Sequence, residues 1–413
     1  MIRLKPFDRI SYQELREAYI NRLIKANAIA PELQNILKGA TAGKKAKNTI
    51  PQPLATFLNK EGELGLRLLL IGPEPEDMPE SFGGCRGKYA TMRQVFEKII
   101  NTIGKPRRQS EEAEYKKLFR YSQLSRINKS NPEKISYWLQ RQLQVPVCPF
   151  CNRIYTTTLF RESVRPAFDH FFPRSEYPYL AVSLFNLIPI CDICNKAKSD
   201  RIDSIIYPYD ESFDECFESN LPVHAAFRVI PNGDQPWNVF RGQSEAFTIQ
   251  FQPTNDAGET LEGSRCGMIT SVDVQERFSM KGPAYWNRIT NSICVLKLED
   301  LYDTHKNEII RILRNRYQYN RVAITSILKP LLNGENPYAS DAVLILEAQN
   351  MLYFANLDPE DWGITPLNKL KADILKQMDI IEMASSDIIE PLREDEEHGE
   401  RRYFSAAGAV AGV

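Results

Sequence analysis

Two pairs of cysteines in this chain have the spacing of a metal-binding turn. The first pair is Cys148 and Cys151, in "CPFC", and the second is Cys191 and Cys194, in "CDIC". A Cys-x-x-Cys turn directs two sulfurs at one ion, and a structural zinc site needs four ligands in a tetrahedron. The two pairs together therefore predict a structural Zn²⁺ site with four thiolate ligands.

The segment between the two pairs is longer than a zinc ribbon requires, since the usual spacing is about 15–20 residues. It contains an Asp-His pair, Asp169 and His170, and the residue directly after the last cysteine is Asn195. Because Asn195 adjoins a predicted zinc ligand, the ion would fix its position. The extra length must form a folded element that carries the Asp-His pair.

The local pattern predicts a strand, a loop, a second strand and a helix. "VRPAFDHFFP" (164–173) is apolar around Asp169 and ends at a proline, "LIPI" (187–190) is a short apolar run, and "CNKAKSDRI" begins a helix after the second cysteine pair. Neighbouring residues on a strand face opposite sides. One residue of the Asp-His pair can therefore reach a metal while the other faces a reacting group.

These residues resemble the HNH, or ββα-metal, nucleases, especially the subgroup whose zinc is held by four cysteines. Phage junction-resolving endonucleases and the HNH domain of RNA-guided CRISPR effectors are relatives within that family. The resemblance covers only a small part of the 413 residues, and it rests on Cys148, Cys151, Asp169, His170, Asn186, Cys191, Cys194 and Asn195.

The resemblance implies a role for each polar residue of the segment. His170 would be the general base, Asp169 and Asn195 would bind one catalytic Mg²⁺ or Mn²⁺, and Asn186 would order the loop between the strands. Asn195 stands where the last histidine of the family name often falls, a substitution common in the zinc-bearing subgroup.

The chemistry of the residue types favours the same assignment. Mg²⁺ prefers oxygen ligands and keeps several waters, so a carboxylate from Asp169 and an amide oxygen from Asn195 suit it. His170 can accept a proton from water near neutral pH. Lys198, one helical turn after Asn195, and Arg174, after the first strand, are candidates to bind substrate phosphates; the alternative for both is a solvated surface charge.

The chain has 52 Lys and Arg against 53 Asp and Glu, so it is nearly neutral. A neutral total argues against a histone-like nucleic-acid coat but is compatible with a local basic groove, because phosphate attraction acts within about 8–10 Å. Basic stretches occur at 104–109, 119–130 and 311–321, the last two interleaved with aromatic residues. Each suits phosphate contact or a solvated helix face.

The polar start "MIRLKPFDRISYQELREAY" has no apolar segment of a signal peptide, and no apolar run approaches about 18 residues. We therefore expect a cytoplasmic protein without a membrane span. Thiols stay reduced in that compartment, which favours a metal over disulfides. The other cysteines are expected to be small buried apolar residues, and they are Cys85, Cys216, Cys266 and Cys294.

The expected fold class is α+β: a mainly α-helical protein with a central zinc-stapled ββα-metal (HNH) module and a small β insertion. Residues 1–140 are expected to form a helical N-terminal domain and 141–205 the HNH module. Residues 206–384 would hold the β insertion and then a helical C-terminal domain, and 385–413 a disordered tail. One amphipathic helix is expected to cover 111–127.

The predicted function is a metal-dependent HNH endonuclease that hydrolyses DNA phosphodiester bonds, as a bacterial anti-phage defence effector. Its expected partners are DNA, a regulatory ATPase or another protein of a defence operon, and a second copy of the chain if both strands are cut. The chain has no GxxxxGK[ST] ATP-binding loop of its own. The alternatives are a non-catalytic zinc-stabilised module that binds nucleic acid or protein, an HNH RNase and, more remotely, a redox enzyme.

Overall fold

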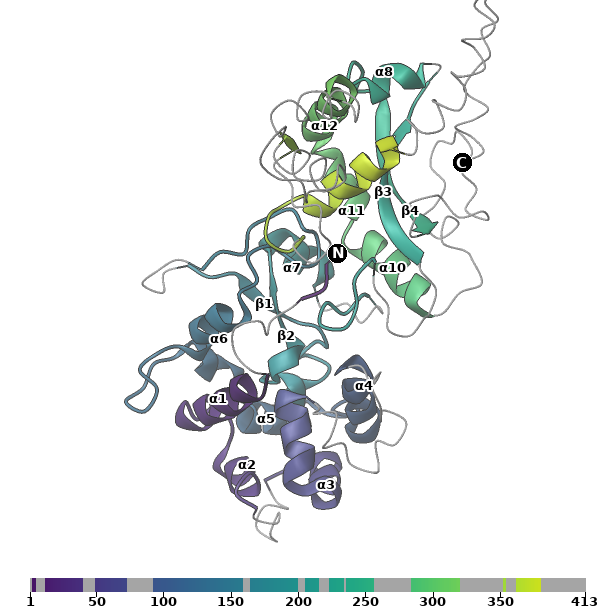
Figure 1. Cartoon of the computed structure of the whole chain (residues 1–413). Helices are drawn as coiled ribbons and strands as arrows, with labels where there is room; N and C mark the ends of the chain where they lie inside the picture. The colour runs from purple at the N-terminus through teal and green to yellow at the C-terminus, as the bar shows by residue number, and fades with distance from the viewer. Residues whose placement is uncertain are drawn as a thin grey trace, which may run out of the picture. The chain divides into compact units, whose positions relative to one another are not determined.

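The computed structural model describes residues 2–4, 12–39, 49–72, 92–158, 164–199, 205–214, 223–233, 235–255, 284–319, 352–353 and 362–379. The chain is mixed α and β, and the sheets in its described part are two antiparallel pairs of strands (Figure 1). It divides into two compact units. The first unit is Met1–Asp203 with Tyr207–Ser212 and Cys216–Glu218, and the second is Ser204–Ile206, Phe213–Glu215 and Ser219–Val413.

The first unit contains both the N-terminal helices and the segment expected to be the HNH module; the finer domain boundaries stay predictions. Its helices are amphipathic and bury their apolar faces together, with Leu66, Leu69 and Leu70 of the longest helix fully buried. The helices are α1 (Tyr12–Lys25), α2 (Pro31–Ile36), α3 (Gln52–Ile71), α4 (Met92–Ile103), α5 (Gln109–Leu118) and α6 (Ile135–Leu143).

The prediction of a single helix over 111–127 is wrong, because α5 ends at Leu118 and the backbone leaves the helical path there. A short 3-10 helix, η3 (Tyr121–Ser125), follows the break. Phe119 forms an antiparallel bridge with Ile29, and the Arg120 N–H donates to the Ala28 carbonyl at 2.7 Å. The backbone at this point is therefore bonded to the segment after α1 and cannot continue the helical ladder.

The predicted strand, loop, strand and helix are present in the first unit. β1 (Ala167–His170) pairs antiparallel with β2 (Leu187–Ile190), with Asp169 opposite Ile188 and His170 opposite Leu187. The helix α7 (Asp192–Lys198) follows at once and contacts β1. The loop between the strands holds η5 (Pro178–Leu180) and η6 (Leu184–Asn186).

Helices α1 and α3 hold this loop in place through hydrogen bonds to its backbone and side chains. The Tyr19 hydroxyl donates to the Val182 carbonyl at 3.0 Å, and the Ser183 hydroxyl donates to the Leu69 carbonyl at 2.5 Å. All four residues are buried. The N-terminal helices thus support the loop that lies between β1 and β2.

The second unit is built around a longer hairpin, β3 (Val223–Pro231) with β4 (Phe247–Asn255). This hairpin lies within residues 206–384, the part of the chain expected to hold the β insertion. Helices accompany this sheet: α8 (Pro236–Phe240), α10 (Ala284–Val295), α11 (Leu298–Asp303), α12 (Lys306–Gln318) and a helix over 368–379 (Figure 1).

Side chains cover both outer edges of the β3–β4 hairpin, where backbone groups would otherwise lack partners. Along β3, Asp373 accepts from the Phe227 N–H at 2.9 Å, and Gln377 accepts from the Val229 N–H at 2.9 Å. Along β4, Glu299 accepts from the Phe251 N–H at 2.8 Å. Helix side chains thus accept the backbone hydrogen bonds that neighbouring strands would accept in a wider sheet.

Two further expectations can be compared with the described residues. No helix among them has the length and apolar character needed to cross a membrane. The expectation that Cys294 is buried is wrong: Cys294 is exposed, whereas Ile293 beside it on α10 is buried. Cys85, Cys216, Cys266 and the tail 385–413 lie outside the described residues.

Candidate metal centre and the residues beside it

The four cysteines of the two pairs meet in one buried cluster. Their Sγ atoms all lie within 4.8 Å of one another, and Cys151 Sγ is 3.9 Å from Cys191 Sγ. A tetrahedral zinc site with Zn–S bonds of about 2.3 Å has sulfur–sulfur edges of about 3.8 Å. The donor set and its spacing therefore fit a structural metal such as Zn²⁺.

Backbone geometry explains why each pair converges. The first turn is closed by the Asn152 N–H, which donates to the Cys148 carbonyl at 2.8 Å, and Asn152 adopts a left-handed φ of 50°. In the second pair, Cys191 caps α7, and its sulfur accepts from the Cys194 N–H at 3.5 Å. The Cys191 N–H points at Cys148 Sγ, also at 3.5 Å, which ties the two turns together.

The thiols of this cluster influence one another strongly. Burial raises the pKa of Cys148, whereas hydrogen bonds from Cys148, Cys151 and Cys194 lower the pKa of Cys191. Such opposite shifts arise because buried thiols this close compete for the same protons. A bound divalent cation allows all four sulfurs to be thiolates at once.

His170, at the end of β1, is half-buried and its ring is oriented by a backbone carbonyl. Its Nε2 lies 3.0 Å from the Ala181 oxygen. A carbonyl oxygen can only accept, so Nε2 carries the proton and the neutral ring has its basic lone pair on Nδ1. The Tyr121 ring packs edgewise on the imidazole, with centroids 4.6 Å apart.

Asp169 points to the other face of β1 and is buried, with 5% of its surface exposed. Its Oδ1 accepts from the Lys198 ammonium at 3.1 Å, and the same ammonium donates to the His170 carbonyl at 3.2 Å. Lys198 is itself only 2% exposed. The structure therefore places Lys198 in the interior, as the counter-charge of Asp169, and not as a solvated lysine.

Asn186 is fully buried at the end of the loop and makes three side-chain hydrogen bonds. Its Oδ1 accepts from the Phe172 N–H at 2.8 Å, and its Nδ2 donates to the Phe172 carbonyl at 3.1 Å and the Leu180 carbonyl at 3.0 Å. The Phe171 N–H donates to the Asn186 carbonyl at 3.0 Å. Asn186 thus joins the two ends of the loop that also contains Ala181.

Asn195 lies one turn into α7 and is half-buried. Its N–H donates to the Cys191 carbonyl at 2.9 Å, so its backbone position depends on the cysteine cluster. Arg174 is exposed in the loop after β1, and its guanidinium lies 5.2 Å from the Tyr121 ring centroid. The structure brings Asp169, His170 and Lys198 together and places Arg174 beside Tyr121, the residue that contacts His170.

Sequence reasoning missed the tyrosines that frame this site. The Tyr207 hydroxyl donates to the Phe185 carbonyl at 2.7 Å, and the Tyr209 hydroxyl donates to the Leu187 carbonyl at 2.9 Å. Both tyrosines belong to the sequence "YPY" (207–209), in which a single proline separates them. That spacing could have indicated two anchors for β2, but a hydroxyl's partner is set by tertiary packing. Tyr121 belongs to the basic stretch 119–130 with its aromatic residues, but its contact with His170 comes from tertiary packing.

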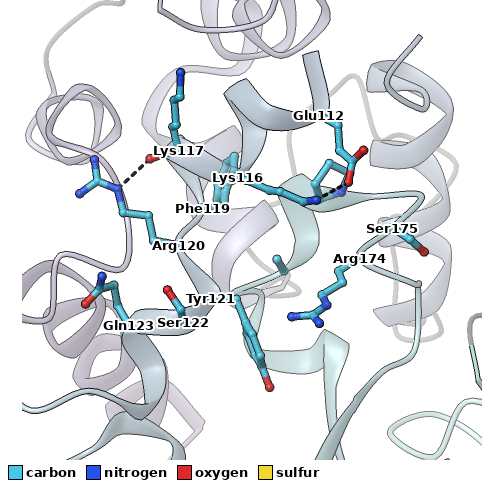
Figure 2. Close-up of a pocket in the computed structure, with 12 residues that line it drawn as sticks. Glu112, Lys116, Lys117, Phe119, Arg120, Tyr121, Ser122, Gln123, Arg174 and Ser175 are labelled. Carbon is cyan, nitrogen blue, oxygen red and sulfur yellow. Dashed lines mark hydrogen bonds and ion pairs between the residues drawn. The ribbon is translucent and has the colours of Figure 1, made fainter. Parts of the chain in front are cut away.

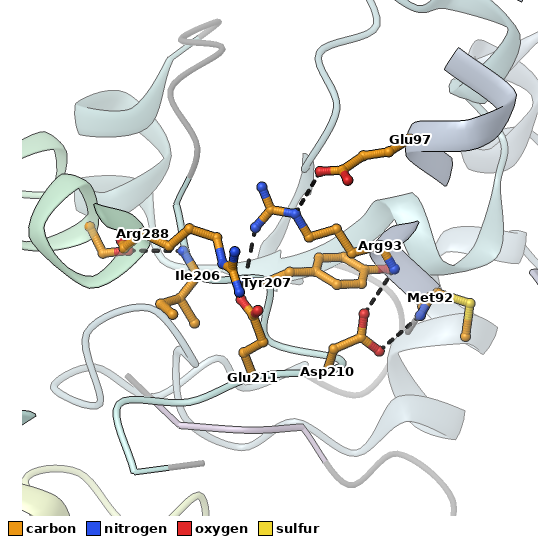
Figure 3. Close-up of polar contacts among 9 residues, drawn as sticks. Met92, Arg93, Glu97, Ile206, Tyr207, Asp210, Glu211 and Arg288 are labelled. Atoms are coloured by element: carbon orange, nitrogen blue, oxygen red, sulfur yellow. Dashed lines mark hydrogen bonds and ion pairs between the residues drawn. The ribbon is translucent and has the colours of Figure 1, made fainter. Parts of the chain in front are cut away.

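The segment with the two tyrosines is itself anchored to α4 (Figure 3). The Asp210 carboxylate accepts from the Met92 and Arg93 N–H groups, at 3.2 and 2.8 Å, and so caps the first turn of that helix. Arg93 reaches Glu97 at 2.8 Å and Glu211 at 3.8 Å. This network joins α4 to the residues that hold β2.

Comparisons of the chain with protein-family models, with curated proteins and with solved structures each found no match.

Proposed function

We propose that this protein is a metal-dependent endonuclease of the HNH type that hydrolyses DNA phosphodiester bonds. One observation carries the proposal: a buried four-cysteine cluster joins the Cys148–Cys151 turn, which precedes a strand–loop–strand–helix unit, to the junction of that unit's second strand and its helix. Asp169, His170 and Asn195 all belong to that unit. The order of residue types along the unit is that of the four-cysteine HNH nucleases.

In this proposal His170 is the general base. Its Nε2–H donates to the Ala181 carbonyl oxygen, at 3.0 Å between nitrogen and oxygen, so Nδ1 is the nitrogen that takes a proton from the attacking water. Asn186 acts through His170, because it ties Leu180 and Phe172 and thereby fixes the loop that presents the Ala181 carbonyl. It is a positioning residue.

The catalytic metal of the proposal would be held by Asp169 and Asn195. A carboxylate can accept about four contacts over two oxygens, so the Lys198 ammonium on Oδ1 occupies only part of that capacity. When bound, Mg²⁺ or Mn²⁺ would stabilise the charge that develops on the phosphate and on the departing oxygen. Lys198 would orient the Asp169 carboxylate in the interior through their ion pair.

Nicking of a supercoiled plasmid by the full chain tests the proposal. We expect nicking that requires added Mg²⁺ or Mn²⁺ and that falls about 10²–10⁴-fold in a His170→Ala protein, since this is the usual contribution of a general base. His305→Ala, in the second unit, serves as the matched control and is expected to retain activity. Zinc content and thermal unfolding establish that both variants are folded.

The other outcomes separate the alternative functions. Degradation of single-stranded RNA in place of the plasmid would make the protein an RNase with the same residues. Nucleic-acid binding without hydrolysis of either substrate, by a zinc-containing protein, would support a non-catalytic binding module. Equal nicking by the wild type and His170→Ala would remove His170 from the chemistry.

The wider role of an anti-phage defence effector, restrained by an ATPase or another partner, extends this proposal. Its support is the sequence resemblance together with the risk that an unrestrained nuclease poses to its host.

A further inference from the structure

A pocket of about 730 Å³ opens in the first unit between the break after α5 and the loop that follows β1 (Figure 2). Pockets of roughly 300–1,000 Å³ are the size that proteins use for small ligands or for parts of larger ones. Its walls come from two segments far apart in sequence: Lys116, Lys117, Arg120, Tyr121, Ser122 and Gln123 on one side, and Arg174, Ser175, Pro178 and Ala181 on the other.

Positive charge dominates the described lining of this pocket, with four cations and a single acidic residue, Glu112. Glu112 is paired with Lys116, at 2.5 Å. Arg120 uses its Nε to donate to the Lys117 carbonyl at 2.8 Å, and Arg174 lies over the Tyr121 ring. Among the described residues neither arginine has a carboxylate partner, so both guanidinium groups can donate to an anion.

A role in capping the helix accounts for only part of this arrangement. Cations are favoured in the last turn of a helix, where Lys116 and Lys117 lie. Arg174 belongs to a separate segment, whose place beside α5 depends on the tertiary fold. Two arginines on facing walls are suited to a phosphate, because the planar guanidinium donates several N–H groups in a fixed geometry.

The pocket adjoins the proposed catalytic histidine through two shared residues. The Tyr121 ring lines the pocket and also packs edgewise on the His170 imidazole, at 4.6 Å between centroids. Ala181 lines the pocket and its carbonyl oxygen lies 3.0 Å from His170 Nε2. A nucleic-acid strand bound in the pocket would therefore run beside His170.

We infer that this pocket binds a phosphate of a nucleic-acid strand, through Arg120 and Arg174, next to the bond that His170 addresses. The inference rests on the proposed function for the place of the scissile bond, but the binding itself does not require hydrolysis. One of the two arginines of this site, Arg120, follows α5 and lies outside the strand–loop–strand–helix unit. The shared chemistry is the phosphodiester backbone, which DNA and RNA both supply.

Fluorescence anisotropy with the full chain tests the inference, without added divalent metal so that nothing is cleaved. The probes are fluorescein-labelled duplex DNA, single-stranded DNA and single-stranded RNA of the same sequence. Arg120→Ala/Arg174→Ala is compared with Arg126→Ala/Lys129→Ala, which removes the same charge from exposed positions outside the described lining of the pocket. Arg174→Ala alone guards against misfolding, because Arg174 is exposed.

We expect the pocket double variant to bind roughly tenfold more weakly per arginine, since a hydrogen bond to a charged group contributes about one power of ten or more. Its dependence on salt should flatten by about one unit of log–log slope per arginine. The control double variant should lose much less. The probe that binds most tightly identifies the nucleic acid.

Equal weakening of the two double variants would overturn the inference, because general charge would then explain binding. Wild-type affinity in the pocket variant, or no binding by the wild type, would overturn it as well. Plasmid nicking without a binding defect in the pocket variant would leave the proposed function standing and remove the pocket. Binding through the pocket without nicking would support the phosphate site and contradict the proposed nuclease function.

Discussion

Each unit of this protein contains one two-stranded antiparallel sheet in its described part, and the two sheets are stabilised in different ways. The β1–β2 sheet pairs only four residues on each strand. Directly after β2, the cysteine cluster links the start of α7 to the Cys148–Cys151 turn. The β3–β4 sheet pairs nine residues on each strand and has both edges covered by helix side chains. A hairpin alone is at best marginal in water, so each sheet needs support from outside.

The kind of support matches what each sheet carries. The short sheet presents Asp169 and His170 on β1, and the cysteine cluster lies directly after its β2 strand, at the start of α7. The long sheet packs aromatic rings, such as Phe227 against Phe251 at 4.1 Å between centroids. In the same unit, Lys369 is fully buried between Asp214 and Asp373, at 2.7 and 3.2 Å.

Removal of the metal should produce the largest difference in stability between the two sheets. In Cys194→Ser, or after chelation, we expect the β1–β2 sheet to lose protection from hydrogen exchange while the β3–β4 sheet keeps it. Structural zinc contributes on the order of 10 kcal/mol in small zinc domains, which is as large as the whole stability of a typical domain. Zinc analysis combined with exchange measured by mass spectrometry tests this, with Cys294→Ser as the control.

The complementary change is Lys369→Met in the second unit. Burial alone would lower the pKa of Lys369, but the carboxylates of Asp214 and Asp373 outweigh it and raise that pKa. The substitution leaves two acidic groups without this counter-charge, and loss of one partner from a buried pair costs about 3–5 kcal/mol. Denaturant unfolding should show that loss, while plasmid nicking should stay at the wild-type level, because the proposed catalytic residues belong to the first unit.

Lys376→Met is the control for that prediction, because Lys376 is an exposed lysine of the same helix. A surface change of this kind usually stays within about 0.5 kcal/mol. An equal loss of stability in both variants would show that the buried ion pairs do not support the β3–β4 sheet.

A smaller effect should follow from Asp210, which caps α4 in the first unit. Loss of solvation raises the pKa of Asp210 to about 7, against its usual 3.8. The folded chain then keeps a proton that the unfolded chain has lost, so stability decreases as the pH rises from about 4 to about 7. The slope is at most about 1.4 kcal/mol per pH unit, and less here because Asp210 is partly exposed.

Asp210→Asn should remove that part of the pH dependence. Unfolding free energies of the wild type and the variant across pH 4–8 give the difference directly, and Asp300→Asn, an exposed residue in the first turn of α11, provides the matched comparison. A difference that does not change with pH would mean that Asp210 titrates in the folded protein as it does in the unfolded chain.

The two basic stretches that contain aromatic residues have different surroundings in the structure, and this difference could not be predicted from their sequences. Both 119–130 and 311–321 were expected to be phosphate contacts or solvated faces. In the second stretch Arg316 is buried against Asp379 at 2.5 Å, and Arg314 donates to the Gly242 carbonyl at 3.0 Å. In the first, Arg120 lines an open pocket. The difference lies in the partners that the fold supplies, and these are distant in sequence.

The sequence by itself determined the elements whose signal is local. Strand β2, the cysteine turns and the position of the Asp-His pair follow from residue spacing over a few positions, because a turn or a strand needs little more. A helix was expected to begin after the second cysteine pair, but α7 begins earlier, at Asp192 inside that pair. Only the tertiary structure decided that α5 ends before Arg120, that the Lys198 ammonium lies on Asp169, and that the Ala181 carbonyl orients His170. Each of these depends on a hydrogen bond or ion pair whose two groups come from separate segments. Such pairings are settled when the chain packs, by which polar groups lose water and must find a partner.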